Sequence, residues 1–198
     1  MTFIKEDNIW IAYYKVYTLT DTTIQDNLDK QHEFRKHSIL IDESLTRDEK
    51  SEVIKLLNKD YDYYKVLLNE GIKRICEICQ NECLATSYCE YCIRNYLKTK
   101  FSNWSSGNND IDVLIQKCQL ETLAPNKVIE WIPYKNLQNI NYLTKGGCSE
   151  IYTAEWIDGR YDEWDLNKLN RIGDQYVILK ELVNVESANR SWLEEVYN

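Results

Sequence analysis

The stretch CEICQNECLATSYCEYC, from Cys76 to Cys92, carries five of the seven cysteines of this 198-residue chain. It contains two C-x-x-C units, Cys76/Cys79 and Cys89/Cys92, which are separated by nine residues. A C-x-x-C turn directs two sulfurs the same way, so two such turns can enclose one tetrahedral Zn²⁺. The pattern therefore predicts a structural zinc site with four thiolate ligands and no open position for a substrate.

Other interpretations of this segment stay open. Cys83 lies between the two units and is either a substitute ligand or a free thiol. The cysteines could also be small buried side chains without metal, although Asn81 and Glu82 make the loop polar. A redox C-x-x-C is disfavoured because the βαβ setting of that motif is absent. Residues 71–100 hold five basic and three acidic residues, a net charge of +2 that favours protein contact over nucleic acid.

Composition is that of a soluble globular protein, with 43% hydrophobic and 28% charged residues. The net charge of -8 gives no broad attraction to phosphate backbones, so we expect no nucleic-acid partner. No apolar run reaches the length of a bilayer crossing, and the opening MTFIKEDNIW lacks the pattern of a secretory signal. We therefore expect a cytoplasmic protein with no membrane partner, where a reducing environment favours metal-bound cysteines over disulfides.

Residues 1–70 are predicted to form a helical N-terminal region. Thr46 and Glu49 have capping-box spacing, which marks a helix start. Apolar residues then recur every three or four positions and form one stripe, and Gly71 would end the helix. The stripe consists of Val53, Leu57, Tyr61, Tyr64 and Leu68.

Four other stretches have weaker helical signals. Ile9–Leu19 fits either a strand or a buried helix, because its alternation is imperfect. Asp21–Lys36 is polar and is expected to be helical. Helices are also expected over Tyr91–Lys100 and over Ile111–Leu120, the latter capped by Asp110.

These patterns predict an α+β chain with four segments. The helical region is followed by a zinc-knuckle-like segment over 71–100 and a helical linker over 101–127. The run TLAPNK at 122–127, with Pro125, marks the next boundary. Residues 128–198 are rich in strand-like runs.

The stretch INYLTKGGCSEIYTAEW, residues 140–156, predicts two strands joined by a glycine turn. Glycines at such a turn let the backbone approach a ligand, although most GG turns are only hairpins. A third strand, Gln175–Leu182, contains Lys180, and the helical segment ESANRSWLEEVYN follows with Glu194 and Glu195. Each charged residue could simply face solvent. Their order, however, is the order in which a protein kinase assembles its phosphate site.

Residues 130–198 resemble the start of a protein kinase domain. EWIPYKNLQNINYLTKGGCSEIYTAEW is similar to the opening of a group of tyrosine-kinase-like fungal kinases. Those proteins carry a cysteine-pair segment upstream, so the resemblance extends back to about Cys76, and it covers residues 1–70 only loosely. The resemblance implies an incomplete kinase small lobe, with three antiparallel strands and the start of the helix that follows them.

The resemblance also implies nucleotide-binding residues. Lys180 matches the lysine of V-A-I-K, here V-I-L-K, and would hold the α- and β-phosphates. Glu195, or Glu194 one position earlier, would pair with that lysine. Thr144 and Ser149 replace two of the family's glycines, so tight ATP binding is not expected. The whole loop would comprise Leu143, Thr144, Lys145, Gly146, Gly147, Cys148, Ser149 and Ile151.

Two kinase motifs, HRD-x-x-x-x-N and DFG, do not occur in the sequence, so we expect no catalytic residues in it. One hypothesis is an N-terminal fragment of a protein kinase, whose parent binds ATP and phosphorylates protein Ser/Thr or Tyr. The alternative is a non-catalytic zinc-binding module for protein interaction with a vestigial kinase segment. A third is a helical adaptor with an accidental glycine turn. The expected partners are ATP and a protein partner or substrate.

Overall fold

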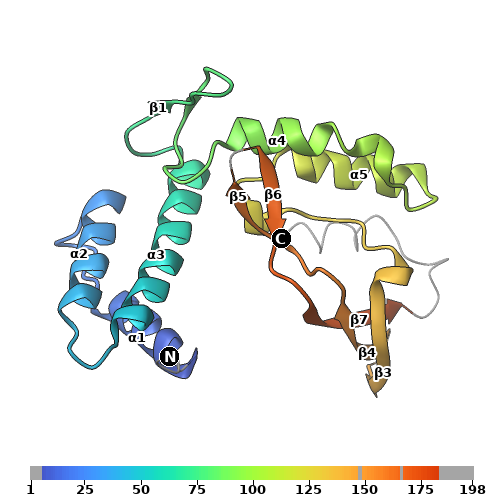
Figure 1. Ribbon diagram of the computed structural model, residues 1–198, viewed down its shortest axis with the longest axis horizontal. Coiled ribbons are helices and arrows are strands. Elements are labelled where there is room, and N and C mark those ends of the chain that lie inside the picture. The colour runs from blue at the N-terminus through green and yellow to red at the C-terminus, as the bar shows by residue number, and fades with distance from the viewer. Residues whose placement is uncertain (1–5, 147–148, 166, 183–198) are drawn as a thin grey trace.

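The computed structural model describes residues 6–146, 149–165 and 167–182, and within them the chain is α+β, as predicted (Figure 1). None of the helices in this part of the chain combines the length and the apolar character that a bilayer crossing requires. The α-helices are α1 (Glu6–Leu19), α2 (Leu28–Ile41), α3 (Arg47–Leu68), α4 (Glu90–Lys98) and α5 (Asn109–Leu120). The short 3-10 helices are η1 (Phe101–Asn103), η2 (Pro125–Lys127) and η3 (Tyr134–Asn136). The strands are β1 (Arg74–Ile75), β2 (Glu82–Cys83), β3 (Leu137–Lys145), β4 (Ser149–Trp156), β5 (Tyr161–Asp165), β6 (Lys168–Arg171) and β7 (Gln175–Leu182).

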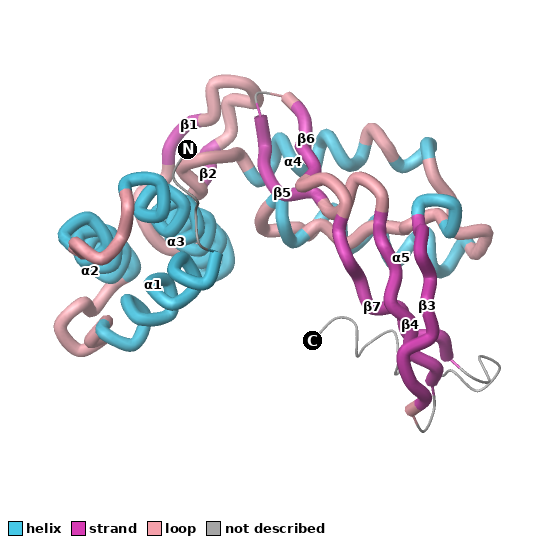
Figure 2. The backbone as a smooth tube through the Cα atoms, turned by 60° about the horizontal axis from the view of Figure 1, so that its bottom comes forward, coloured by secondary structure: helices cyan, strands magenta, loops and turns pink. Residues whose placement is uncertain are grey.

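Helices α1, α2 and α3 pack together as a three-helix unit (Figures 1 and 2). The ambiguous stretch Ile9–Leu19 is helical. Ile9, Ala12 and Val16 are buried at intervals of three and four residues, which places them on one face of a helix. The buried core of the unit consists of Ile9, Ala12, Val16, Ile39, Val53 and Leu57.

The start of α3 confirms the predicted capping box. The amide of Glu49 donates to Thr46 Oγ1 at 3.2 Å, and the amide of Thr46 donates to Glu49 Oε2 at 2.9 Å. The prediction that Gly71 ends this helix is wrong. The helix ends at Leu68, because Asn69 adopts the left-handed conformation with φ of 52°. Asparagine tolerates this conformation better than most residues with a side chain, so it can take the place of glycine there.

Two other helix starts also differ from the prediction. The stretch predicted as helical from Asp21 begins as a turn, and Asn27 caps α2 by accepting from the amide of Lys30 at 3.0 Å. Asn108, and not Asp110, caps α5, because its side chain accepts from the amides of Asp110 and Ile111. In both cases an upstream asparagine satisfies the free amides of the first turn.

Strands β3, β4 and β7 form an antiparallel sheet in that order (Figure 2). This arrangement matches the three predicted strands. Neighbouring registers align Thr144 with Ile151 and Ile151 with Lys180. The helix predicted for 186–198 lies outside the described residues, so the kinase small lobe stays a prediction.

A second hairpin, β5–β6, lies between β4 and β7 in the sequence and was not predicted. It packs on α4 and η2 instead of joining the three-stranded sheet. Leu169 enters a buried cluster with residues of the loop before Cys89, of α4 and of the position before η2, namely Ala85, Tyr88, Ile93, Leu97 and Ala124. The hairpin also reaches α3, where Lys59 Nζ lies 2.7 Å from Asp162 and 3.3 Å from Glu163.

Asp62 attaches the cysteine segment to α3. Its carboxylate is fully buried and accepts four hydrogen bonds, from the amide and hydroxyl of Thr86 and the amide and hydroxyl of Ser87. A charge buried in this way is tolerated because each oxygen is paired with two donors. The loop before Cys89 is therefore positioned by a side chain of the preceding helix.

We expect Asp62→Ala to lower the free energy of unfolding by about 2–4 kcal/mol, because it removes the buried carboxylate that accepts all four hydrogen bonds from Thr86 and Ser87. Urea denaturation measures the loss. Asp112 is the matched control, since it also accepts from two serines, Ser105 and Ser106, but at the surface. Asp112→Ala should cost clearly less, and equal losses would contradict the anchoring role of Asp62.

Candidate metal centre

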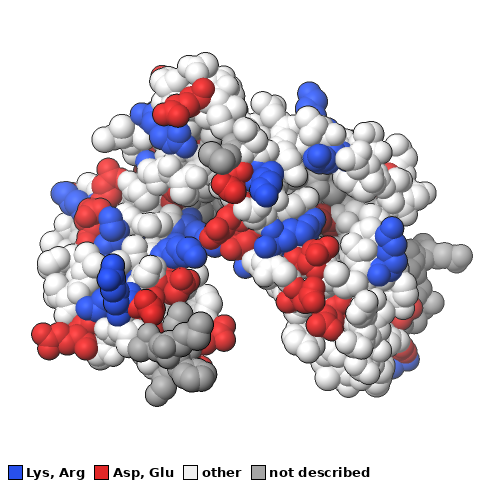
Figure 3. All heavy atoms as spheres, in the orientation of Figure 1, with Lys and Arg blue, Asp and Glu red and all other residues white. Residues whose placement is uncertain are grey.

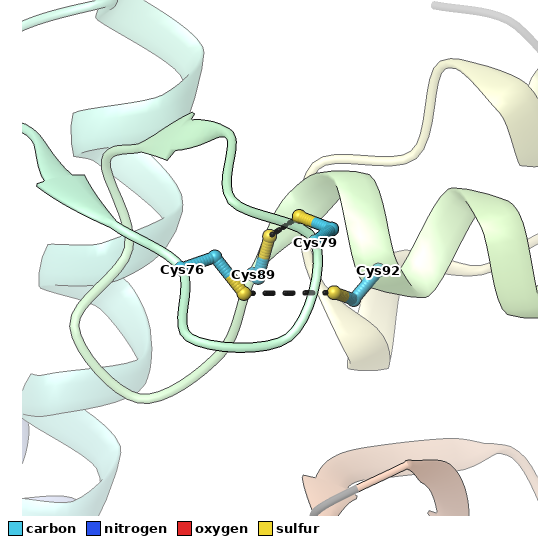
Figure 4. A group of neighbouring side chains, drawn as sticks. All are labelled: Cys76, Cys79, Cys89 and Cys92. Atoms are coloured by element: carbon cyan, nitrogen blue, oxygen red, sulfur yellow. Dashed lines mark hydrogen bonds between the residues drawn. The ribbon is translucent and has the colours of Figure 1, made fainter.

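The first C-x-x-C unit lies in the turn between β1 and β2. The amide of Gln80 donates to the carbonyl of Cys76 at 2.9 Å, and the amide of Cys76 donates to the carbonyl of Asn81 at 2.9 Å. Gln80 closes the turn in the left-handed conformation, with φ of 58°. These bonds bring Cys76 and Cys79 to the same side of the turn (Figure 4).

The second unit lies at the start of α4. Cys89 is the residue before the helix, and its carbonyl accepts from the amide of Ile93 at 3.1 Å. Cys92 follows within the first turn, so both sulfurs face the β1–β2 turn (Figure 4). Arg74 holds the loop that leads to Cys89 by donating to the carbonyls of Ala85 and Tyr88.

The four sulfurs are close enough to hold one metal ion. Cys76 Sγ lies 3.7 Å from Cys92 Sγ, and Cys79 Sγ lies 3.6 Å from Cys89 Sγ. All four sulfurs lie within 4.8 Å of one another. Zinc bound tetrahedrally at about 2.3 Å from each sulfur would separate neighbouring sulfurs by about 3.8 Å. The arrangement is consistent with zinc, and four thiolates would fill its coordination shell.

The centre is shielded from water. Cys76, Cys89 and Cys92 are buried, and Cys79 is partly buried. Trp164 of β5 packs against the cluster and makes an edge contact with Tyr96 of α4. The hairpin β5–β6 thus supplies one wall of a centre whose ligands lie more than seventy residues earlier.

The thiols differ in their tendency to ionise. Amides of Cys79 and Ile78 donate toward Cys76 and lower the pKa of that thiol to about 6. Burial raises the pKa of Cys89 well above its ordinary value and also raises that of Cys92. A zinc ion bound by all four sulfurs would have to displace the protons of Cys89 and Cys92. Zinc affinity should consequently rise with pH.

The predicted nucleotide residues are only partly within the described chain. Leu143, Thr144 and Lys145 end β3, while Ser149 and Ile151 lie in β4. The amide of Gly146 donates to the carbonyl of Ser149 at 2.8 Å, and this backbone hydrogen bond joins the ends of β3 and β4. Gly147, Cys148, Glu194 and Glu195 lie outside the described residues.

Lys180 is exposed on β7, on the same sheet face as Ile178 and Ile151, because Ile151 is its partner in β4. Ile178 and Tyr176 of this face are also exposed. Lys145 lies near Glu150, with its ammonium 3.1 Å from the carboxylate. The described residues thus form an open sheet face beside the glycine turn.

The chain matches no protein-family model, no curated protein and no solved structure. Function must therefore be argued from the geometry of its own residues.

Three residues that shape the centre were not predicted from the sequence. Asp62 and Trp164 are far from the cysteines in the chain, and their contacts arise only from the packing of α3 and β5. Glu90 entered only the net charge of residues 71–100, yet it is buried next to Cys89 at the start of α4. The one available signal was its position between two predicted ligands, where a carboxylate is unusual.

We expect the chain purified without chelator to contain about one zinc ion, because four thiolates complete a tetrahedral site. Cys76→Ser should lose this zinc, whereas Cys83→Ser should keep it. Cys118→Ser, a thiol on α5 away from the cluster, is the control for the loss of any cysteine. Metal analysis by mass spectrometry gives the readout, and a folded, zinc-free wild-type chain would contradict the assignment.

Proposed function

We propose that this chain is a zinc-stabilised module that binds another protein. The observation that carries the proposal is the convergence of four cysteine sulfurs from two C-x-x-C units. A site with four thiolates has no free position for a reacting group, so its contribution is structural. The metal supplies folding free energy to a segment with little core of its own.

The knuckle needs this support because its backbone is barely paired. Strands β1 and β2 have two residues each, and Arg74 and Ile75 face Cys83 and Glu82. Two-stranded pairs of this size are not stable alone in water. Zinc would hold the turn in one conformation, so that less conformational entropy is lost when a partner binds to it.

The same segment presents apolar side chains to solvent. Ile72 is 81% exposed, and Ile75 and Ile78 are each more than half exposed. Ile72 and Ile75 precede the first C-x-x-C unit and Ile78 lies within it, so a metal bound there would fix the backbone around Ile75 and Ile78. Exposed apolar side chains that lie this close together in the chain suit a protein contact.

Charges around this surface are of both signs. Figure 3 shows basic and acidic side chains interspersed over the face that it presents. Lys73 and Glu82 form one such pair on the knuckle, with 3.6 Å between ammonium and carboxylate. A surface of mixed charge around apolar residues suits a protein partner better than a phosphate backbone.

The test is affinity capture from the source cells, with zinc retained throughout. We expect at least one protein to bind the wild-type chain and to be lost with the double variant Ile75→Ser/Ile78→Ser and with Cys76→Ser. Ile24→Ser is the matched control, since Ile24 is at least as exposed but lies between α1 and α2. Identical captured proteins for wild type and the Ile75/Ile78 variant would contradict a contact at the knuckle.

A second candidate function is nucleotide binding by residues 137–182, as the N-terminal part of a protein kinase. Support comes from the strand order β3, β4, β7 and from Lys180 lying opposite Ile151, next to the glycine turn. In a kinase, the corresponding lysine holds the α- and β-phosphates. Ile178, two residues before Lys180, is exposed on the same face of the sheet and offers an apolar surface for the adenine ring of a nucleotide.

We expect ATP with Mg²⁺ to bind weakly, and Lys180→Ala to lower the affinity at least about tenfold, the effect of losing one charged hydrogen bond. Lys168→Ala, which removes an exposed lysine of the β5–β6 hairpin, should bind as the wild type does. Titration calorimetry measures both. No labelled phosphate should reach protein, because HRD and DFG do not occur in the sequence. An unchanged affinity for Lys180→Ala would exclude this site.

A further inference from the structure

Cys83 lies beside the four-cysteine cluster without belonging to it. It is only 1% exposed and sits at the end of β2, where its residue partner is Arg74. Its sulfur, the sulfur of Cys89 and a carboxylate oxygen of Glu90 lie within 4.8 Å of one another. Three donor groups therefore converge at a second point, and one of them, Cys89, also belongs to the first site.

Glu90 has an unusual environment for a carboxylate. It is the first residue of α4 and only 5% exposed. One oxygen, Oε1, accepts from the amide of Leu84 at 3.0 Å, whereas Oε2 is buried and has no hydrogen-bond partner. A buried carboxylate oxygen without a donor is costly, and a bound cation would offset that cost.

We propose that Cys83, Cys89 and Glu90 bind a second divalent cation of the thiophilic class, such as Zn²⁺ or Cd²⁺, with the Cys89 thiolate shared between the two ions. Two sulfurs and one oxygen suit such borderline-soft cations better than Mg²⁺ or Ca²⁺, which prefer oxygen alone. Three protein ligands leave one position for water or an added ligand. The inference rests on the proposed zinc module, because Cys89 would be a ligand of both ions.

A pocket lies beside one of the three donors. It has a volume of about 200 Å³ and is lined by Glu90, Leu84 and Glu82, among others, but by neither Cys83 nor Cys89. Its two basic side chains are already engaged, since Lys73 pairs with Glu82 and Arg94 donates to the carbonyl of Thr122. Access from solvent is one of the requirements for a metal site.

The experiment is a zinc titration of the metal-free, reduced full chain in competition with a chromophoric chelator. The wild-type chain should take up two equivalents, the second more weakly, because it has fewer protein ligands. Glu90→Gln should leave the first equivalent intact and weaken the second at least about tenfold. Glutamine retains an oxygen that can accept from Leu84, so this variant changes the charge with little change of shape.

Cys83→Ser should give the same result as Glu90→Gln. The two variants change different ligands, so a folding defect in one of them would not decide the test. Circular dichroism checks that both variants fold. Glu77→Gln, which removes an exposed carboxylate of the same segment, and Cys118→Ser are the matched controls and should keep both equivalents. If the wild-type chain binds a single zinc ion tightly and no second one, the second site alone is overturned. The same holds if a second zinc ion binds with an affinity that neither Glu90→Gln nor Cys83→Ser changes. Loss of the first equivalent in Cys83→Ser would assign Cys83 to the first ion and overturn the proposal. Absence of any tight equivalent would instead contradict the zinc module itself.

Discussion

Four cysteine sulfurs crowded into one small volume are the constraint on which the middle of this molecule depends. Between α3 and α4 the chain has only two strands of two residues each, so backbone hydrogen bonds alone hold it weakly. A cation held by the four sulfurs would join the β1–β2 turn to the first turn of α4. Because Cys89 immediately precedes that helix, such an ion would also fix the position at which α4 begins.

The surrounding elements hold this centre from several sides. Asp62 of α3 binds the loop before Cys89 through Thr86 and Ser87, and Arg74 binds the same loop through its carbonyls. Trp164 of β5 covers the sulfurs from the strand-rich part of the chain. The centre is therefore the point where the helical unit and the hairpin meet, and Lys59 with Asp162 adds a second link between them.

Local patterns in the sequence were sufficient where one side chain acts on its near neighbours. The capping box of Thr46 and Glu49 and the two C-x-x-C turns are of this kind, and so are the three strands of the sheet. The hairpin β5–β6 could not be found in this way, because YDEWD and KLNR are mostly polar and only Leu169 is deeply buried. The end of α3 was misplaced by preferring Gly71 to Asn69, since both residue types accept left-handed geometry. The convergence of the four cysteines was thus predictable, whereas the residues that surround them depend on contacts distant in sequence.

Trp164 is synthesised well after the cysteines that it covers. A ribosome completes all of the cysteine ligands first and reaches the hairpin about seventy residues later, an interval of several seconds. During that interval the nascent thiols are open on the side that β5 later covers, so they can exchange ions and react with oxidants. Once the hairpin docks, Trp164 covers the sulfurs, so the exchange of a bound ion would slow. The cell's zinc supply at the moment of translation would then decide which ion the mature chain retains.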